Sequence, residues 1–172
     1  VLLVTGTGKA FSSGADLKEI KEFSPERAEE FSLAGHRVFD AVESFPCPVI
    51  AAINGYAFGG GLELACCCDL IYASEGARFG QPDAKVGMIT GWGGTFRLGR
   101  RVGLPRAKEL FFTAGILSAE EALKVGIADR VFPAETFWDE VLSVAEVIAG
   151  NAPIAIRLEK RLMNAAAAYR AA

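Results

Sequence analysis

Apolar residues along the chain form short continuous runs and longer stretches in which they recur every three or four positions. The continuous runs at 1–5 and 49–53 are typical of buried strands. After Ser24 and Pro25, apolar residues recur at near-helical spacing up to Phe45, which predicts a helix with a serine cap and a proline in its first turn. Strands separated by helices predict an α/β fold.

The same reading predicts further elements toward the C-terminus. Strands are expected at 70–73 and 128–132, with a short extended piece that ends at 79–83. Ser118 and Glu121 have the spacing of a capping box, which predicts a helix start. Helices are expected at 94–102, 105–113, 118–124, 134–149 and 153–170.

Length and composition suit one domain with a sizeable core, because the chain has 172 residues of which 51% are hydrophobic. No long linker divides it, so residues 1–172 are expected to form a single domain, with a core over about 1–133 and an incomplete helical part over about 134–172. The chain begins inside a strand pattern and stops inside a helical one. We therefore expect it to be a piece of a longer protein.

Charge and hydropathy argue against two classes of partner. With 18 basic and 21 acidic residues the net charge is −3, so no general attraction to nucleic acid or to an anionic membrane is expected. No apolar stretch reaches the roughly 20 residues that span a bilayer, and no secretory signal pattern is present. We expect a cytoplasmic protein, with the mitochondrial matrix as the alternative for its full-length parent.

The most informative segment is 57–69, where three consecutive glycines open an apolar helical run that has Glu63 in its first turn. Glycine allows close approach of the backbone to a ligand, and the unpaired N–H groups of a helix start favour negative charge. A glycine cluster is usually a turn, and a first-turn glutamate usually just complements the helix dipole. Here the buried strand at 49–53 leads into the glycines, which favours an oxyanion site.

The cysteines and the lone histidine do not indicate a metal site. Cys66, Cys67 and Cys68 are consecutive on the predicted helix, so their side chains diverge by about 100° and are expected to be buried small hydrophobes. Cys47 lies between two prolines, and neither a CxxC pair nor a disulfide framework is present. His36 is expected at the surface or partly packed. We therefore expect no metal.

Four segments carry a family resemblance in the order in which they occur. They are 9–18 (KAFSSGADLK), 54–64 (NGYAFGGGLEL), 79–83 (FGQPD) and 91–95 (GWGGT). Together they resemble the crotonase, or enoyl-CoA hydratase/isomerase, superfamily, over residues 1 to about 133. The resemblance implies a spiral of strand-strand-helix turns, an acyl-CoA thioester substrate with no separate cofactor, and a homotrimer or a dimer of trimers.

The resemblance also implies roles for individual residues. The N–H groups of Ala15 and Gly60 would form an oxyanion hole for the thioester carbonyl, where losing one donor costs on the order of 3 kcal/mol in the transition state. Lys9 and Lys18 are candidate phosphate partners, with simple solvation as the equal alternative. The implied substrate and CoA contacts are Lys9, Ala15, Asp16, Leu17, Lys18, Gly59, Gly60 and Gly91.

In hydratases of this family two carboxylates hold one water, and one takes its proton while the other protonates Cα. Glu63 matches the first, and Asp83 stands where the second is normally Glu, which retracts the carboxylate by about 1.5 Å. Gly91, whose N–H would help to position the water, is retained. Thr90 stands where many members have Pro, and Phe96 where Gln is common. Hydratase chemistry stays the leading interpretation, and the acyl group is left open.

Three interpretations follow. The first is an acyl-CoA hydratase or dehydratase that uses Glu63 and Asp83. The second is another enolate-forming activity, such as a double-bond isomerase, a decarboxylase or a thioester hydrolase; isomerases of this family often keep only the second acid, so the presence of both argues against one. The third is a non-enzymatic RNA-binding or scaffolding protein. Arg157, Lys160 and Arg161 form a basic helical stripe, but such a stripe is more often a solvated face.

Overall fold

The computed structural model describes residues 1–169, and their side chains as far as residue 166. Two sheets of four strands each organise the chain, in the orders β1-β3-β5-β8 and β2-β4-β6-β7. Neighbouring strands are parallel except β6 and β7, which are antiparallel. The strands are β1 (Leu2–Thr5), β2 (Ala10–Ser12), β3 (Val49–Ile53), β4 (Tyr56–Phe58), β5 (Leu70–Ser74), β6 (Arg78–Gly80), β7 (Ile116–Ser118) and β8 (Arg130–Phe132).

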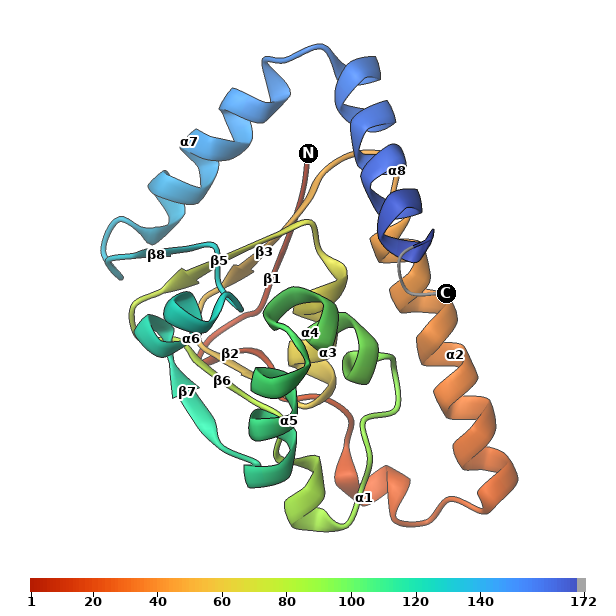
Figure 1. Ribbon diagram of the computed structural model, residues 1–172. Coiled ribbons are helices and arrows are strands. Elements are labelled where there is room, and N and C mark those ends of the chain that lie inside the picture. Colours follow the sequence, from red (N-terminus) through yellow and green to blue (C-terminus); the bar gives the residue numbers. More distant parts are fainter. Residues whose placement is uncertain (170–172) are drawn as a thin grey trace.

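The first three turns of the chain each give one strand to each sheet before a helical segment follows, as in β1, β2 and α1 (Figure 1). This confirms the predicted α/β spiral of strand-strand-helix turns. The helices are α1 (Leu17–Ile20), α2 (Pro25–Glu43), α3 (Gly60–Cys67), the 3-10 helix η1 (Pro82–Val86), α4 (Gly94–Val102), α5 (Leu104–Thr113), α6 (Ala119–Val125), α7 (Phe137–Ala149) and α8 (Pro153–Tyr169).

The central strand β3 is buried on both faces, as its continuous apolar run predicts. Successive side chains of a strand point to opposite faces, so the strand divides its residues between two clusters. Val49, Ala51 and Ile53 belong to the main core with α3 and α4. Ile50 and Ala52 pack with α7, which covers the other face of the first sheet (Figure 1). The sheet is thereby fixed on both sides of the segment that leads to the glycine-rich turn.

The sequence located most of the longer elements and missed the shortest ones. The helix expected at 94–102 has those bounds, and the capping box is confirmed, because Ser118 and Glu121 each donate a backbone N–H to the other's side chain. The helix expected from 134 begins at Phe137, after a turn over 134–136 in which the Ala134 N–H donates to Glu75, the residue that follows β5. Of the last predicted helix, residue 170 lies outside the described residues. The unforeseen elements are β2, β4, β7, α1 and η1, and η1 begins at Pro82, inside the piece that was expected to be extended as far as residue 83.

Helix α8 attaches to the rest of the chain through its polar side chains. Lys160 is only 7% exposed, and its Nζ lies 2.7 Å from Asp69 Oδ2 and 3.1 Å from the carbonyl oxygen of Cys47. The Asn164 amide donates to the Glu43 carbonyl at the end of α2. The interpretation of the basic stripe as a solvated face was therefore wrong for Lys160, which is a buried ion-pair partner. This loss of a free charge also weakens the RNA-binding interpretation.

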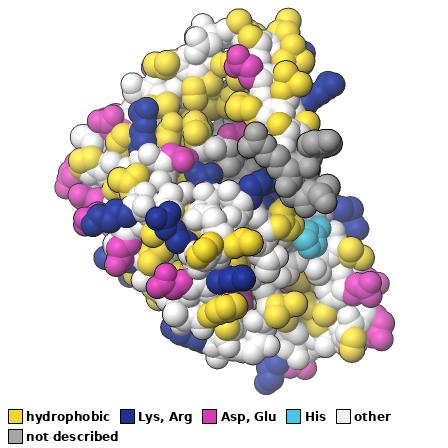
Figure 2. All heavy atoms as spheres, viewed as in Figure 1, with side chains coloured by type: hydrophobic (Ala, Val, Ile, Leu, Met, Phe, Trp, Pro, Cys, Tyr) yellow, Lys and Arg dark blue, Asp and Glu magenta, His cyan; other side chains and the backbone are white. Residues whose placement is uncertain are grey.

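The three adjacent cysteines are buried, as expected, and burial raises the pKa of Cys66 and of Cys68 to about 12. His36 is partly packed. Apolar side chains gather at the top of the face in Figure 2, over α7 and α8. The exposed apolar residues of these two helices include Leu142, Val147 and Leu162. Within residues 1–169 no single helix is long and apolar enough to cross a membrane, whereas α7 and α8 would pass together by length and composition, with a bend of 102° between them.

Candidate active site

Glu63 lies in the first turn of α3, at the point where the chain leaves β4. Gly59 precedes this helix with a φ of +50°, in a region that side-chain-bearing residues rarely adopt. Its carbonyl accepts the Glu63 N–H at 3.0 Å, which closes the first helical turn. Glu63 is 2% exposed. The glycine turn therefore delivers a carboxylate into the interior rather than to the surface.

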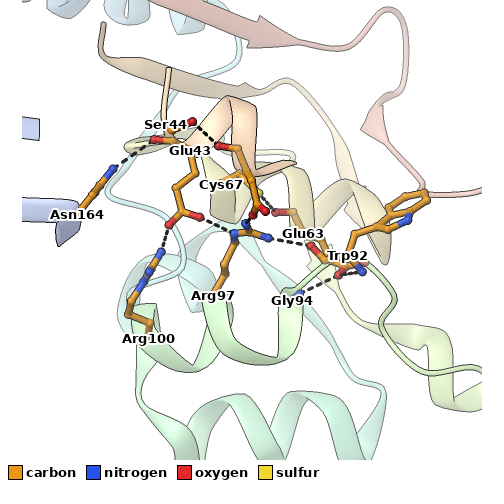
Figure 3. Close-up of polar contacts among 10 residues, drawn as sticks. Glu43, Ser44, Glu63, Cys67, Trp92, Gly94, Arg97, Arg100 and Asn164 are labelled. Atoms are coloured by element: carbon orange, nitrogen blue, oxygen red, sulfur yellow. Dashed lines mark hydrogen bonds and ion pairs between the residues drawn. The ribbon is translucent and has the colours of Figure 1, made fainter. Parts of the chain in front are cut away.

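The Glu63 carboxylate is held by the start of α4. Its Oε1 accepts the N–H of Trp92 at 2.9 Å and that of Gly94 at 2.7 Å (Figure 3). Gly94 is the first residue of α4, so its N–H is one of the donors that a helix leaves unpaired. Burial raises the pKa of Glu63, the two N–H donors oppose that rise, and the charge of Asp83 adds to it. The close approach requires glycine, because a Cβ at position 94 would lie 2.8 Å from Glu63 Cγ.

Asp83 lies in η1, directly after β6, and faces the same glycine turn. A Cβ at Gly59 would lie 3.5 Å from Asp83 Oδ1 and 3.7 Å from Oδ2. The carboxylate is half-buried, its Oδ2 has no hydrogen-bond partner within the described residues, and burial raises the pKa of Asp83. The structure thus brings both predicted acids to the start of α3.

Gln81 was not singled out from the sequence, although it belongs to the same segment as Asp83. It is 1% exposed, and neither atom of its side-chain amide is hydrogen-bonded within residues 1–169. Its Nε2 lies beside Gly94, 3.1 Å from where a Cβ would be. Buried polar groups are normally paired, and leaving one unpaired costs about 1–3 kcal/mol. The amide and the free oxygen of Asp83 therefore mark a place beside Glu63 where a polar molecule can bind.

The segment that carries Ala15 packs against the start of α3. Gly14 has a φ of +90°, and a Cβ there would lie only 2.9 Å from the backbone nitrogen of Gly60. Gly60 is the first residue of α3, so its N–H has no partner inside the helix. The two predicted oxyanion residues therefore belong to backbone segments in direct contact, and Glu63 lies less than one turn away.

The remaining predicted contacts lie around this turn. Asp16 caps α1 by accepting the Lys18 N–H at 2.9 Å. Lys9 and Lys18 are exposed, and Leu17 is 51% exposed. The carbonyl of Gly91 accepts the Ser32 hydroxyl at 2.7 Å, which ties this loop to α2.

The sequence did not predict Arg97 as a residue of the site, because arginine is rarely fully buried. Its side chain has no exposed surface, and it donates to the Trp92 carbonyl and to Glu43 Oε2, each at 2.8 Å, and also pairs with Asp40. Figure 3 shows the guanidinium between Glu43 of α2 and the loop that holds Glu63. The one available signal was its spacing, since Arg97 follows Gly94 by about one helical turn.

Comparison with known proteins gives a consistent result. The sequence pattern of the family described as enoyl-CoA hydratase/isomerase matches residues 1–172. The short-chain-enoyl-CoA hydratase of Clostridium acetobutylicum is 43% identical over 95% of this chain and 63% of its own length. The mitochondrial enoyl-CoA hydratase of Pongo abelii is 43% identical over 96% of this chain and 56% of its own length.

A solved structure agrees with these sequences. The enoyl-CoA hydratase from Bacillus anthracis superposes with a TM-score of 0.91 at 42% identity, over 94% of this chain and 63% of that one. The chain thus spans less than two thirds of the length of each of these relatives. The family match covers the whole chain and includes every segment that builds the site, and the chain belongs to the enoyl-CoA hydratase/isomerase family.

Proposed function

We propose that the protein containing this chain adds water across the double bond of a 2-enoyl-CoA thioester. The observation that carries this proposal is the meeting of Glu63 and Asp83 at the start of α3, beside unpaired backbone donors. Glu63 takes a proton from water as the oxygen attacks Cβ, and Asp83, in its protonated form, delivers a proton to Cα. Transfer of a proton from Glu63 to Asp83 through solvent then restores both acids. One water is consumed, and a 3-hydroxyacyl-CoA is formed.

The surroundings of the two acids support these tasks. Two N–H groups fix Glu63 Oε1, which leaves Oε2 to accept a hydrogen bond from the attacking water. Burial raises the pKa of Glu63, and a carboxylate with a raised pKa is a stronger base near neutral pH. Asp83 Oδ2 lacks a partner among the described side chains and is available to the same water.

The thioester carbonyl would lie between the N–H groups of Ala15 and Gly60. Attack at Cβ moves charge onto the carbonyl oxygen, where the donors and the helix dipole stabilise it. Gly59 and Gly91 would border the reacting atoms. The CoA portion would follow Lys9, Asp16, Leu17 and Lys18, all of which are exposed.

The relatives support the substrate and extend the proposal. One carries the name short-chain-enoyl-CoA hydratase and another, from Syntrophomonas wolfei, the name crotonyl-CoA hydratase. We infer a single catalytic domain over residues 1–172 and a homotrimer or dimer of trimers, to which the exposed apolar faces of α7 and α8 are suited. The cytoplasm or the mitochondrial matrix is its expected location.

The test is turnover of crotonyl-CoA followed by mass and chiral analysis of the product. A gain of one water supports the proposal. An unchanged mass with a displaced double bond would replace it by isomerisation, and release of free CoA would replace it by thioester hydrolysis. A parallel RNA-binding titration at increasing salt tests the non-enzymatic alternative, for which a salt-sensitive affinity without turnover would be the signature.

A further inference from the structure

The indole of Trp92 fills the space between α2 and the start of α3. Two glycines make room for it, because a Cβ at Gly35 of α2 or at Gly60 of α3 would overlap the ring atoms. Gly60 meets the six-membered ring at Cζ3 and Cε3, whereas Gly35 meets the five-membered ring at Cδ1 and Nε1. The ring is thus wedged against the backbone of a proposed oxyanion residue.

Aromatic side chains of α2 support the ring from behind. The ring centroids of Phe31 and Phe39 lie 5.2 and 5.3 Å from that of Trp92, distances typical of interacting aromatic pairs. The indole N–H donates to the Phe31 carbonyl at 3.4 Å, and the backbone N–H holds Glu63. The position of the indole is therefore set both by the backbone of Trp92 and by the indole N–H.

The reaction geometry brings the acyl chain to this ring. If the thioester oxygen lies on Gly60 N–H, Cβ must lie within about 3.5 Å of a water that Glu63 holds. The Glu63 carboxylate is itself 2.9 Å from the Trp92 nitrogen. Carbons beyond Cβ therefore extend from a point bordered on one side by Gly60 and on another by the Trp92 backbone, and the Trp92 indole lies directly against Gly60.

We propose that the Trp92 indole is the end wall of the acyl site and restricts the substrate to short acyl groups. The inference rests on the proposed function, since it takes the oxyanion position from it. It adds a specificity-determining residue whose backbone serves the catalytic carboxylate while its side chain limits acyl length. A longer chain could enter only if the ring left its place between the two glycines.

The test compares 2-decenoyl-CoA with crotonyl-CoA in wild type and in Trp92→Ala. The ratio of their kcat/KM values, long over short, is expected to rise by about tenfold or more when the wall is removed. Because loss of a packed tryptophan can impair folding, Trp92→Phe is measured as well and is expected to give a smaller rise of the same sign. The matched control is Trp138→Ala, since Trp138 is 42% exposed on α7 and should leave the ratio unchanged.

Calorimetric binding of butyryl-CoA and decanoyl-CoA, which have no double bond to hydrate, separates the wall from the chemistry. Decanoyl-CoA is expected to bind wild type more weakly than butyryl-CoA, and Trp92→Ala should reduce that difference. If crotonyl-CoA is not hydrated but the preference for butyryl-CoA over decanoyl-CoA still depends on Trp92, the proposed function is wrong and the role of Trp92 in limiting acyl length is supported. The proposed role of Trp92 would be wrong if folded Trp92 variants kept the wild-type turnover and binding ratios. It would also be wrong if Trp138→Ala changed these ratios equally.

Discussion

The two acids of the site lie beside the same glycine turn in unlike surroundings. Glu63 is almost fully buried, and two backbone N–H groups fix one of its oxygens. Asp83 is half-buried on a 3-10 turn, and its Oδ2 accepts no hydrogen bond from a described residue. One carboxylate is held in a set orientation by the main chain, and the other is left open to a ligand.

This contrast suggests how two carboxylates from different elements, α3 and η1, take different proton-transfer roles beside one glycine turn. Desolvation is the largest cause that raises the pKa of each. The N–H groups of Gly94 and Trp92 stabilise the charged form of Glu63, whereas Asp83 has only its own backbone N–H to do so. The base is thereby held in one orientation, while Asp83 keeps an unpaired oxygen for exchange of a proton with substrate. Variants of Glu63, of Asp83 and of Arg97, which supports the loop that holds Glu63, test the two roles separately.

The largest expected effect follows removal of the fixed base. Glu63→Gln keeps the shape of the side chain and an oxygen for the two N–H donors, but cannot accept the proton of water. Turnover of crotonyl-CoA should fall by about 10² to 10⁴, while affinity for butyryl-CoA stays within several-fold of wild type. Steady-state kinetics and calorimetry measure the two quantities. Unchanged turnover would make Glu63 an ordinary first-turn residue.

Removal of the open acid should cost somewhat less. Asp83→Asn is expected to lower turnover by about 10², because proton delivery to Cα is lost while the fixed base remains. Asp83→Glu tests whether the shorter side chain matters. It advances the carboxylate by about 1.5 Å toward Gly59, so turnover of the native substrate should fall. Full activity in Asp83→Asn would show that the chemistry runs on Glu63 and the oxyanion hole alone.

A smaller effect is expected from the support behind Glu63. Arg97→Gln removes the charge that links the Trp92 carbonyl to Glu43, so we expect about a tenfold lower kcat and a stability loss on the order of 3 kcal/mol. Arg101→Gln is the matched control from the same helix, because Arg101 pairs with Asp129 and the Ile127 carbonyl, away from the site. Denaturant unfolding separates the two readouts. A kcat loss in both variants in proportion to stability would make Arg97 structural only.

The comparison also shows what could be read from the sequence. Glu63 was located because a buried strand, a glycine turn and an apolar helix are local patterns. The environment of the Glu63 carboxylate could not be located in the same way. It depends on Trp92 and Gly94, about thirty residues away, and on how α4 is placed along α3, which only the packing of the two helices determines. Asp83 was located by family resemblance, whereas its unpaired oxygen is a property of the folded site.

The missed elements have a similar physical origin. Strands β2, β4 and β7 have three residues each, too few for periodicity to show, and they exist because neighbouring strands pair with them. Burial of Arg97 and Lys160 runs against the usual preference of both residue types and is stabilised by acidic partners on other elements.

The raised pKa of Glu63 makes stability depend on pH with a definite sign. A carboxyl that binds its proton more tightly in the folded chain stabilises the fold below its ordinary value of 4.5, and that contribution is lost as pH rises through the higher native pKa. Glu63→Gln removes the titrating group, so its urea midpoint should fall less than that of wild type between acidic and neutral pH. Parallel curves for the two proteins would contradict a burial-raised pKa.

The smallest expected effect is a shift in the pH profile, and it tests whether the two acids sense each other. Glu63 acts as a base only when ionised, so kcat/KM should rise with pH through its raised pKa. The negative charge of Asp83 is one cause of that rise, after burial. In Asp83→Asn this charge is gone, and the acid limb of the residual activity should move to lower pH. Arg101→Gln should leave the limb in place, because Arg101 pairs away from Glu63. If the limb of Asp83→Asn coincides with that of wild type, the two carboxylates titrate independently, and the contrast between them is one of geometry alone.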